Sequence, residues 1–215
     1  MMPVRITERD ALLVVDVQND FCPGGALAVD RGDEVVPVIC RIAPLFPHIV
    51  MTQDWHPKNH LSFVSQHEGK PIFETIDVAY GRQILWPEHC VQGSHGAELH
   101  KDLPLERAEL ILRKGFHREI DSYSAFQEND RVTKTGLAGY LRERGIERIF
   151  LTGLAFDYCV RYSAIDACAA GFQAVVIEDA CREIDLTGSL EEARKEFSQY
   201  GVELIESSFI APDSM

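Results

Sequence analysis

Short apolar runs alternate with amphipathic segments along most of the chain. The runs are rich in Val, Ile and Leu and are bounded by polar or turn-forming residues. This pattern is typical of strands buried on both faces of a parallel sheet. The predicted strands are Ala11–Val17, Ile49–Thr52, Leu110–Arg113, Arg148–Thr152, Ala174–Glu178 and Val202–Glu206.

Most segments between these strands carry apolar residues at helical spacing, with recognisable start and stop residues. Pro37 and Pro44 confine the first helix to the stretch between them. The predicted helices are a part of Asp33–Leu45, a helix that Thr135 caps and Gly145 ends, a helix from Asp157 that Gly171 ends, and Ser189–Tyr200.

Strands that alternate with helices predict a three-layer α/β/α fold, with a mostly parallel central sheet and helices on both faces. One region breaks this alternation. From Trp55 to Glu109 the chain holds Pro, His, Gly and aromatic residues without a sustained period. We expect a long irregular loop with a functional role there. Without an internal repeat or linker, residues 1–215 are predicted to form a single domain.

The charge balance narrows the class of partner. The formal net charge is -13, from 34 acidic residues against 21 Lys and Arg, and no basic tract interrupts it. Nucleic acid and anionic membranes are therefore not expected as partners. A hydrophobic fraction of 46% suffices for a sizeable core. A small-molecule site is the favoured interpretation.

Cysteine usage and the start of the chain predict a cytoplasmic protein. The six cysteines are scattered without a C-x-x-C pair, and Met1–Asp10 lacks the apolar core of a secretory signal. Reduced thiols are expected in such a protein. The longest early apolar run, Ala11–Val15, is far too short to span a bilayer.

Chemically capable side chains follow four of the predicted strands, and ligands of parallel α/β sheets bind at the carboxyl ends of strands. A single acid after a strand is commonly only a turn or a helix cap, so it is their co-occurrence that indicates a site. These residues are Asp16, Asp54, Lys114 and Cys159.

Cys159 lies where a strand gives way through a turn to a helix. The helix dipole there is expected to favour the thiolate and lower the thiol pKa, and free N–H groups of the first turn could receive an oxyanion. Taken alone, Cys159 is equally well explained as a buried structural cysteine. Asp16 could accept the thiol proton and Lys114 could stabilise both anions. The other cysteines are predicted to be structural: Cys22, Cys40, Cys90, Cys168 and Cys181.

A second set suits a metal ion. Asp54 and His56 form an Asp-x-His pair at a strand end, and His89 in the irregular region can complete a set of two imidazoles and one carboxylate. Such a set suits Zn²⁺, Fe²⁺ or Mn²⁺. Among eight histidines a chance cluster is the alternative. The remaining histidines are predicted to be surface or packing residues, apart from His60, whose role stays open: His48, His67, His95, His100 and His117.

Three aromatic residues stand in polar loops close to these motifs: Phe21, Trp86 and Tyr123. Aromatic side chains so placed can form the walls of a pocket for a flat ring, although each could equally be loop packing.

Together these motifs resemble the nicotinamidase branch of the isochorismatase-like cysteine hydrolases. The resemblance runs from Leu13 to about Asp179 and follows the family's order. It covers the stretches Asp-x-Gln-Asn-Asp-Phe, Asp-Trp-His-Pro, Trp-Pro-x-His-Cys-Val, Lys-Gly and Gly-x-Ala-x-Asp-Tyr-Cys-Val.

The resemblance implies a catalytic triad of Asp16, Lys114 and Cys159, which hydrolyses nicotinamide to nicotinate and ammonia through a thioester. It extends this activity to pyrazinamide. It also implies a cis peptide bond between Leu154 and Ala155, and an oxyanion hole formed by the N–H groups of Ala155 and Cys159.

The resemblance further implies that Asp54, His56 and His89 bind one divalent metal ion, Zn²⁺ or Fe²⁺ or else Mn²⁺, which accepts the pyridine nitrogen. Phe21 and Trp86 would sandwich the ring, with Tyr123 nearby.

Three alternatives remain open. The chain could be another enzyme of the same fold, such as an isochorismatase or an N-carbamoyl amidohydrolase, although isochorismatases lack the metal set. It could be a metal-hydroxide hydrolase in which Cys159 is structural. It could also be a binding protein without catalysis, which would leave the residues at the strand ends unexplained. The sequence does not decide the metal or whether the chain forms a homo-oligomer.

Overall fold

The computed structural model describes residues 3–211, so the two ends of the predicted domain, residues 1–2 and 212–215, lie outside the described part. Its centre is a six-stranded sheet in the order β6-β3-β2-β7-β8-β9, in which every neighbouring pair is parallel. The strands are β2 (Asp10–Val15), β3 (His48–Asp54), β6 (Leu110–Lys114), β7 (Arg148–Leu154), β8 (Gln173–Arg182) and β9 (Glu203–Ile205). Each corresponds to a predicted strand.

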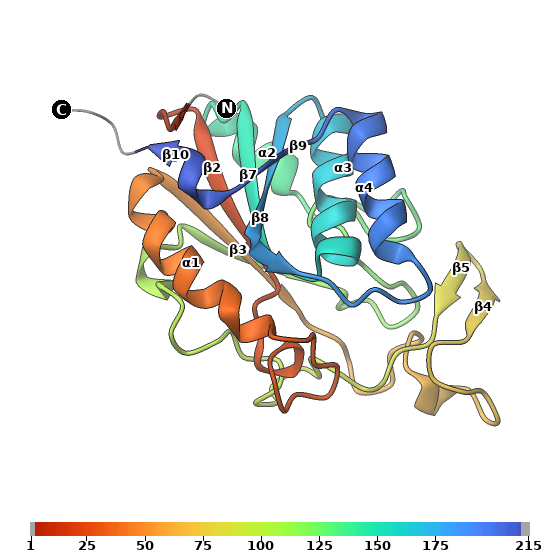
Figure 1. The fold of residues 1–215 in the computed structure, drawn as a ribbon. Coiled ribbons are helices and arrows are strands. Elements are labelled where there is room, and N and C mark those ends of the chain that lie inside the picture. Colours follow the sequence, from red (N-terminus) through yellow and green to blue (C-terminus); the bar gives the residue numbers. More distant parts are fainter. Residues whose placement is uncertain (1–2, 212–215) are drawn as a thin grey trace.

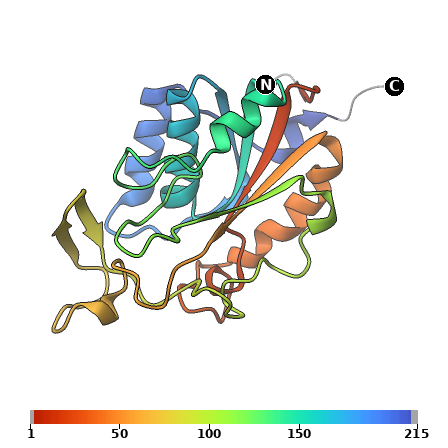
Figure 2. The same cartoon turned by 180° about the vertical axis from the view of Figure 1, so that it is seen from behind.

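Helices cover both faces of this sheet, as predicted (Figures 1 and 2). Successive β2 residues point to opposite faces, so Leu12 and Val14 pack on one side and Leu13 and Val15 on the other. The first face is covered by α1 (Val35–Ile42). The second is covered by α2 (Leu137–Glu143), α3 (Arg161–Ala169) and α4 (Ser189–Tyr200). The three-layer α/β/α prediction is confirmed.

The two edge strands differ from the prediction of burial on both faces. Ile111 on β6 is 45% exposed, and β9 has an exposed first residue. The apolar runs do not distinguish edge strands from central ones, because both pack one face against helices.

The helix starts also differ in detail. α1 begins at Val35, before Pro37, because a proline in the first turn occupies a position whose N–H has no helical partner. Gly136, and not Thr135, occupies the N-cap of α2. The helix expected from Asp157 begins with a π-helical turn, Phe156–Val160, and continues as α3.

The region predicted as one irregular loop, Trp55–Glu109, contains a β-hairpin that the sequence analysis missed. β4 (Thr75–Val78) and β5 (Gly81–Ile84) pair in antiparallel fashion and stand apart from the central sheet (Figure 1). The rest of the region is largely irregular, as expected. A further two-stranded sheet joins β1 (Val4–Arg5) to β10 (Ile210–Ala211), so the two ends of the described chain lie together.

All six cysteines are free, in agreement with the expectation of reduced thiols. Across residues 3–211, no helix has both the length and the apolar character needed to cross a membrane.

Candidate active site

Strand register brings the predicted strand-end residues together. β6, β3, β2 and β7 are adjacent in the sheet, and Asp54 and Lys114 are register partners at the carboxyl ends of β3 and β6. β2 ends at Val15, two residues earlier than predicted, so Asp16 is the first residue beyond the strand. Cys159 follows β7 within the π-helical turn. All four side chains are buried at this edge of the sheet.

Lys114 is the centre of the cluster, and its side chain is fully buried. Its Nζ lies 2.8 Å from Asp16 Oδ2 and 2.5 Å from Asp54 Oδ1. It also donates to the carbonyl oxygen of Ser122 at 2.7 Å and to Cys159 Sγ at 3.5 Å. Although burial opposes protonation, the charges of Asp16 and Asp54 raise the pKa of Lys114 well above its usual value. One ammonium group therefore joins both carboxylates to the thiol.

The electrostatics of Cys159 contradict the expectation of a lowered thiol pKa. Burial raises the pKa of Cys159 well above its usual value, and the carboxylates of Asp16 and Asp54 add to the rise, while Lys114 opposes it. The helix-dipole argument considered only the turn and omitted the low dielectric and the two anions. This environment favours the neutral thiol of Cys159, so a nucleophilic role would require a base nearby.

Asp16 is placed to be that base. One of its carboxylate oxygens lies within 4.8 Å of Cys159 Sγ, and the carboxylate is fully buried. Oδ1 accepts a hydrogen bond from the Thr52 hydroxyl at 2.6 Å, whereas Oδ2 forms the ion pair with Lys114 but no well-aligned hydrogen bond. Burial raises the pKa of Asp16, although Lys114 lowers it in part. A carboxylate with a raised pKa is a stronger base for a thiol.

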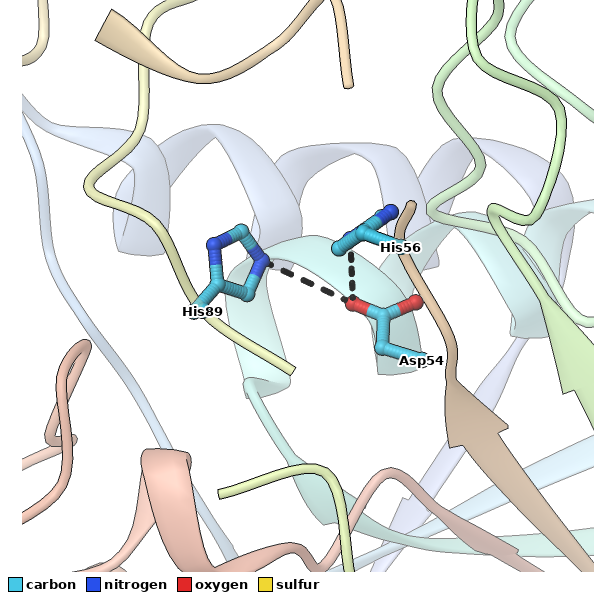
Figure 3. Close-up of side chains that lie close together, drawn as sticks. All are labelled: Asp54, His56 and His89. Carbon is cyan, nitrogen blue, oxygen red and sulfur yellow. Dashed lines mark ion pairs between the residues drawn. The ribbon is translucent and has the colours of Figure 1, made fainter. Parts of the chain in front are cut away.

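The predicted metal ligands also converge (Figure 3). Asp54, His56 and His89 each offer one ligand atom within 4.8 Å of the others. Oδ2 of Asp54 lies 3.4 Å from His56 Nε2 and 3.8 Å from His89 Nε2. Since Oδ1 faces Lys114, Asp54 uses one oxygen for the ammonium and the other for the imidazole pair.

Both imidazoles are oriented by backbone carbonyls. His56 Nδ1 donates to Gly115 O at 2.8 Å, and His89 Nδ1 donates to Pro87 O at 2.8 Å. These bonds place the ring proton on Nδ1 and leave the two Nε2 lone pairs on the side of Asp54, the arrangement that metal-binding histidines need. Burial and His56 lower the pKa of His89 to about 4, so its ring is neutral and could act as a ligand. The donor set fits a divalent metal ion.

His60, left open by the sequence, lies beside His56 with ring centres 4.3 Å apart. Both its nitrogens are engaged elsewhere: Nε2 donates to Ile120 O at 3.2 Å, and Nδ1 accepts from the Ser62 hydroxyl at 2.7 Å. His60 thus lacks the free nitrogen that His56 and His89 present to Asp54.

A small pocket lies over these groups. Its lining includes the three predicted aromatic residues together with Cys159, Ala155, Asp54 and His89. The peptide bond between Leu154 and Ala155 is cis, as the resemblance implies. The sequence analysis missed four other lining residues: Leu27, Asp121, Tyr158 and Ile184. Apolar walls with a few polar groups at one end suit a small, flat, partly polar ligand.

The isochorismatase domain family matches residues 10–208, almost the whole chain. The chain belongs to the isochorismatase family. Among solved structures, it is 55% identical to a nicotinamidase and pyrazinamidase of Acinetobacter baumanii, with a TM-score of 0.93 over 94% of this chain and 98% of the other. This similarity places it in the nicotinamidase branch, as the sequence motifs predict.

Two other similar solved structures contain a bound ligand. A protein of L. infantum, in complex with nicotinate, is 39% identical, with a TM-score of 0.86 over 98% of this chain and 99% of the other. A pyrazinamidase of Pyrococcus horikoshii, in complex with zinc, is 36% identical, with a TM-score of 0.74 over 92% of this chain and 99% of the other.

Two residues that support the site received no role in the sequence analysis, although both belong to the Asp-x-Gln-Asn-Asp-Phe motif of this isochorismatase-family chain. The Gln18 side chain donates to Asp54 O and accepts from Asp54 N, each at 2.8 Å. Asp20 Oδ2 accepts from Cys90 N, next to His89, at 2.7 Å. Both residues fix the backbone beside a proposed metal ligand. The motif marked them, but only the fold reveals their partners, which lie 36 and 70 residues away.

Proposed function

We propose that this protein is a nicotinamidase, which hydrolyses nicotinamide to nicotinate and ammonia and also accepts pyrazinamide. One observation carries the proposal: a buried ammonium, Lys114, contacts Asp16, Asp54 and Cys159 at the polar end of an aromatic-lined pocket. The activities named for the similar Acinetobacter and Pyrococcus proteins support the same substrates.

The first half of the proposed reaction forms the thioester. Asp16 accepts the proton of the Cys159 thiol, and the sulfur attacks the carboxamide carbon of the substrate. Lys114 lies close enough to both groups to offset the negative charge as it moves from carboxylate to sulfur. Asp16 then gives its proton to the amine, so ammonia leaves as the carbon–nitrogen bond breaks.

The second half releases the acid. Asp16, now ionised, takes a proton from a water molecule whose oxygen attacks the thioester carbon. The carbon–sulfur bond breaks, and the Cys159 sulfur recovers its proton from Asp16. The nicotinic acid so formed loses its carboxyl proton to solvent and leaves as nicotinate. The same carboxylate thus acts as base and acid in both halves, which requires no further ionisable group.

The backbone around Cys159 offers an oxyanion site. Ala155 O accepts from Tyr158 N and Val160 N, each at 3.1 Å, on either side of Cys159 in the π-helical turn. We assign the N–H groups of Ala155 and Cys159 to the oxyanion of the tetrahedral intermediates. Fixed backbone donors of this kind stabilise charge that develops in the transition state without having to reorganise.

Asp54, His56 and His89 would hold the divalent metal ion, which we propose to be Zn²⁺ or Fe²⁺, with Mn²⁺ as a third candidate. When bound, the ion would accept the pyridine nitrogen and so orient the ring, a positioning role rather than generation of hydroxide. Phe21 and Trp86 are proposed to enclose the ring faces. We further propose that residues 1–215 act as one cytoplasmic domain with a small-molecule substrate.

Ammonia release from a panel of amides tests the proposal. Nicotinamide and pyrazinamide should be hydrolysed, and Cys159→Ala should lower kcat by at least about 10³-fold. Cys168→Ala is the matched control, because Cys168 lies at the far end of α3, and should retain wild-type rates. Wild-type turnover in Cys159→Ala would instead support the metal-hydroxide hydrolase.

Chelation separates the metal from the thiol. Removal of the ion should lower nicotinamide hydrolysis by about 100-fold, and re-addition with metal analysis should restore it and name the ion. Benzamide lacks the ring nitrogen, so its slow hydrolysis should be unaffected by chelation. An equal loss with both amides would contradict the ring-orienting role. Preference for a carbamoyl substrate over every pyridine amide would favour the other hydrolases of this fold.

A further inference from the structure

The hairpin β4–β5 stands apart from the central sheet (Figures 1 and 2). It nevertheless carries one buried polar side chain, that of Gln83. Gln83 on β5 is 1% exposed, whereas its neighbour Arg82 is exposed. A two-stranded hairpin is marginally stable on its own, and a buried amide is costly unless it is hydrogen-bonded. The partners of Gln83 therefore show what the hairpin is attached to.

The Gln83 amide is bonded through both its nitrogen and its oxygen. Nε2 donates to Asp121 Oδ2 at 2.7 Å and to Ile84 O at 2.8 Å, with the Tyr123 hydroxyl at 3.4 Å from the same nitrogen. Oε1 accepts from the Tyr80 hydroxyl at 2.9 Å. Tyr80, in the turn of the hairpin, in turn accepts from the backbone N–H of Asp121 at 3.2 Å. Two hairpin side chains thus hold the segment that begins at Asp121.

This segment faces the proposed active site. Ser122 O accepts from Lys114 Nζ, and Asp121 and Tyr123 line the pocket. The Tyr123 hydroxyl also accepts from Trp86 Nε1 at 3.0 Å. Trp86 follows the end of β5 by two residues. The same strand therefore leads into one pocket-lining residue, Trp86, and contacts a second one, Tyr123, through Gln83.

We propose that Gln83 is a positioning residue that fixes the separation of Trp86 and Tyr123, and that the hairpin is therefore part of the substrate-binding unit. The inference rests on the proposed function. Within the described part of the chain, Gln83 is not among the residues that line the pocket, so it acts through Tyr123 and Asp121. Because the Tyr123 hydroxyl accepts from Trp86 Nε1, its position fixes the tilt of the Trp86 ring, one of the two faces proposed to enclose the substrate ring. A looser contact between Tyr123 and Trp86 would bind the ring more weakly without changing the thiol chemistry.

Gln83→Met tests the role, because methionine has a similar length and lacks the amide. KM for nicotinamide should rise about 10-fold while kcat falls less than threefold and metal content stays at the wild-type level. In the Cys159→Ala background, nicotinate should bind about 10-fold more weakly by calorimetry. Arg82→Gln, on the exposed neighbour, is the matched control and should match the wild type. A KM within twofold of wild type in folded Gln83→Met would overturn the inference.

A double-mutant cycle with Tyr123→Phe distinguishes positioning from a general loss of structure. If Gln83 acts through the Tyr123 hydroxyl, the rise in KM caused by Gln83→Met should shrink at least threefold in the Tyr123→Phe background. Independent, multiplicative effects on KM would contradict the proposed route.

If Gln83→Met does not fold, Tyr80→Phe removes the donor to Gln83 Oε1 and the acceptor of the Asp121 N–H, and it should raise KM about threefold. An unchanged KM in Tyr80→Phe would then overturn the inference. The proposed function fails separately: it fails if the wild-type protein releases no ammonia from nicotinamide, whatever the hairpin variants do.

Discussion

The proposed triad and the proposed metal ligands meet where Lys114 contacts Asp54, but the two sets are held in place in different ways. Asp16 and Lys114 stand at the ends of sheet strands, and Asp54 and Lys114 are register partners. Their positions are fixed by the central sheet and by one network of opposite charges. His56 and His89 lie in irregular backbone, and their rings are aimed by single bonds to backbone carbonyls.

The proposed triad and the proposed metal ligands should therefore be sensitive to different kinds of substitution. In the triad the side chains stabilise one another, so removing one charge leaves others buried without a partner. Around the proposed metal ligands the backbone determines the orientation of the imidazole rings. A substitution that displaces a ring sterically should therefore weaken metal binding more than a substitution that changes a nearby charge. The predictions below test this division, beginning with the largest expected effect.

Lys114→Met should disable the triad most severely. It leaves the carboxylates of Asp16 and Asp54 buried without their shared cation. Loss of one partner from a buried charge network costs about 3–5 kcal/mol of unfolding free energy. We also expect kcat to fall by at least about 10³-fold. Urea unfolding and steady-state ammonia release measure the two effects.

The control for this variant is Lys101→Met, which removes an exposed ammonium. It should change the free energy of unfolding by less than about 0.5 kcal/mol and leave kcat unchanged. If both lysine variants have the same free energy of unfolding, Lys114 does not stabilise the buried carboxylates of Asp16 and Asp54.

Gly115→Ala should lower metal affinity by a steric effect alone, without a change of charge. Gly115 has φ +67°, and a Cβ there would lie 2.5 Å from His56 Cε1 and 2.8 Å from His56 Nδ1. The ring must move away and lose its bond to Gly115 O. Metal affinity should fall about 10- to 100-fold, as measured by competition with a chromogenic chelator.

Gly139→Ala is the matched control on α2, because nothing lies within 4 Å of a Cβ built there. Metal affinity should be unchanged, and the helix should gain up to about 1 kcal/mol. In Gly115→Ala, the rate at which iodoacetamide alkylates Cys159 should stay within threefold of wild type. A large loss of alkylation would mean that a change at the metal ligands also alters the reactivity of Cys159, so the two sets are not independent.

The same division explains how much the sequence could predict. The strands of the sheet follow from uninterrupted apolar runs, and the rule for strand ends then brings Asp16, Lys114 and Cys159 together. Residue types alone suggested that His89 joins Asp54 and His56, but a chance cluster remained the alternative until the family resemblance, because His89 stands in a region without periodicity. Local patterns carry no signal for a long-range partner such as the one Gln18 finds in Asp54.

The errors have physical causes of the same kind. The thiol pKa of Cys159 was predicted from its own turn, but desolvation and charges from distant strands reverse the direction. The hairpin β4–β5 was missed because its strands are short and only partly buried, so they lack a clear hydrophobic period. Properties that depend on contacts between several distant elements, such as the pKa of a buried thiol, could not be predicted from local sequence patterns.

Thr52→Val should produce the smallest effect and defines the limit of the charge network. The Thr52 hydroxyl donates to Asp16 Oδ1 at 2.6 Å and accepts from Asp16 N at 3.1 Å, and valine preserves the shape of the side chain without these bonds. Because Asp16 carries the proton but does not line the ring pocket, kcat should fall about 10-fold while KM stays within twofold. Thr152→Val, an equally buried threonine on β7 whose contact to Leu13 O is a long 3.5 Å, should change neither constant. A rise in KM alone in Thr52→Val would mean that Thr52 supports substrate binding rather than the basicity of Asp16. The hydrogen bonds around Asp16 would then help to shape the pocket as well as the proposed triad.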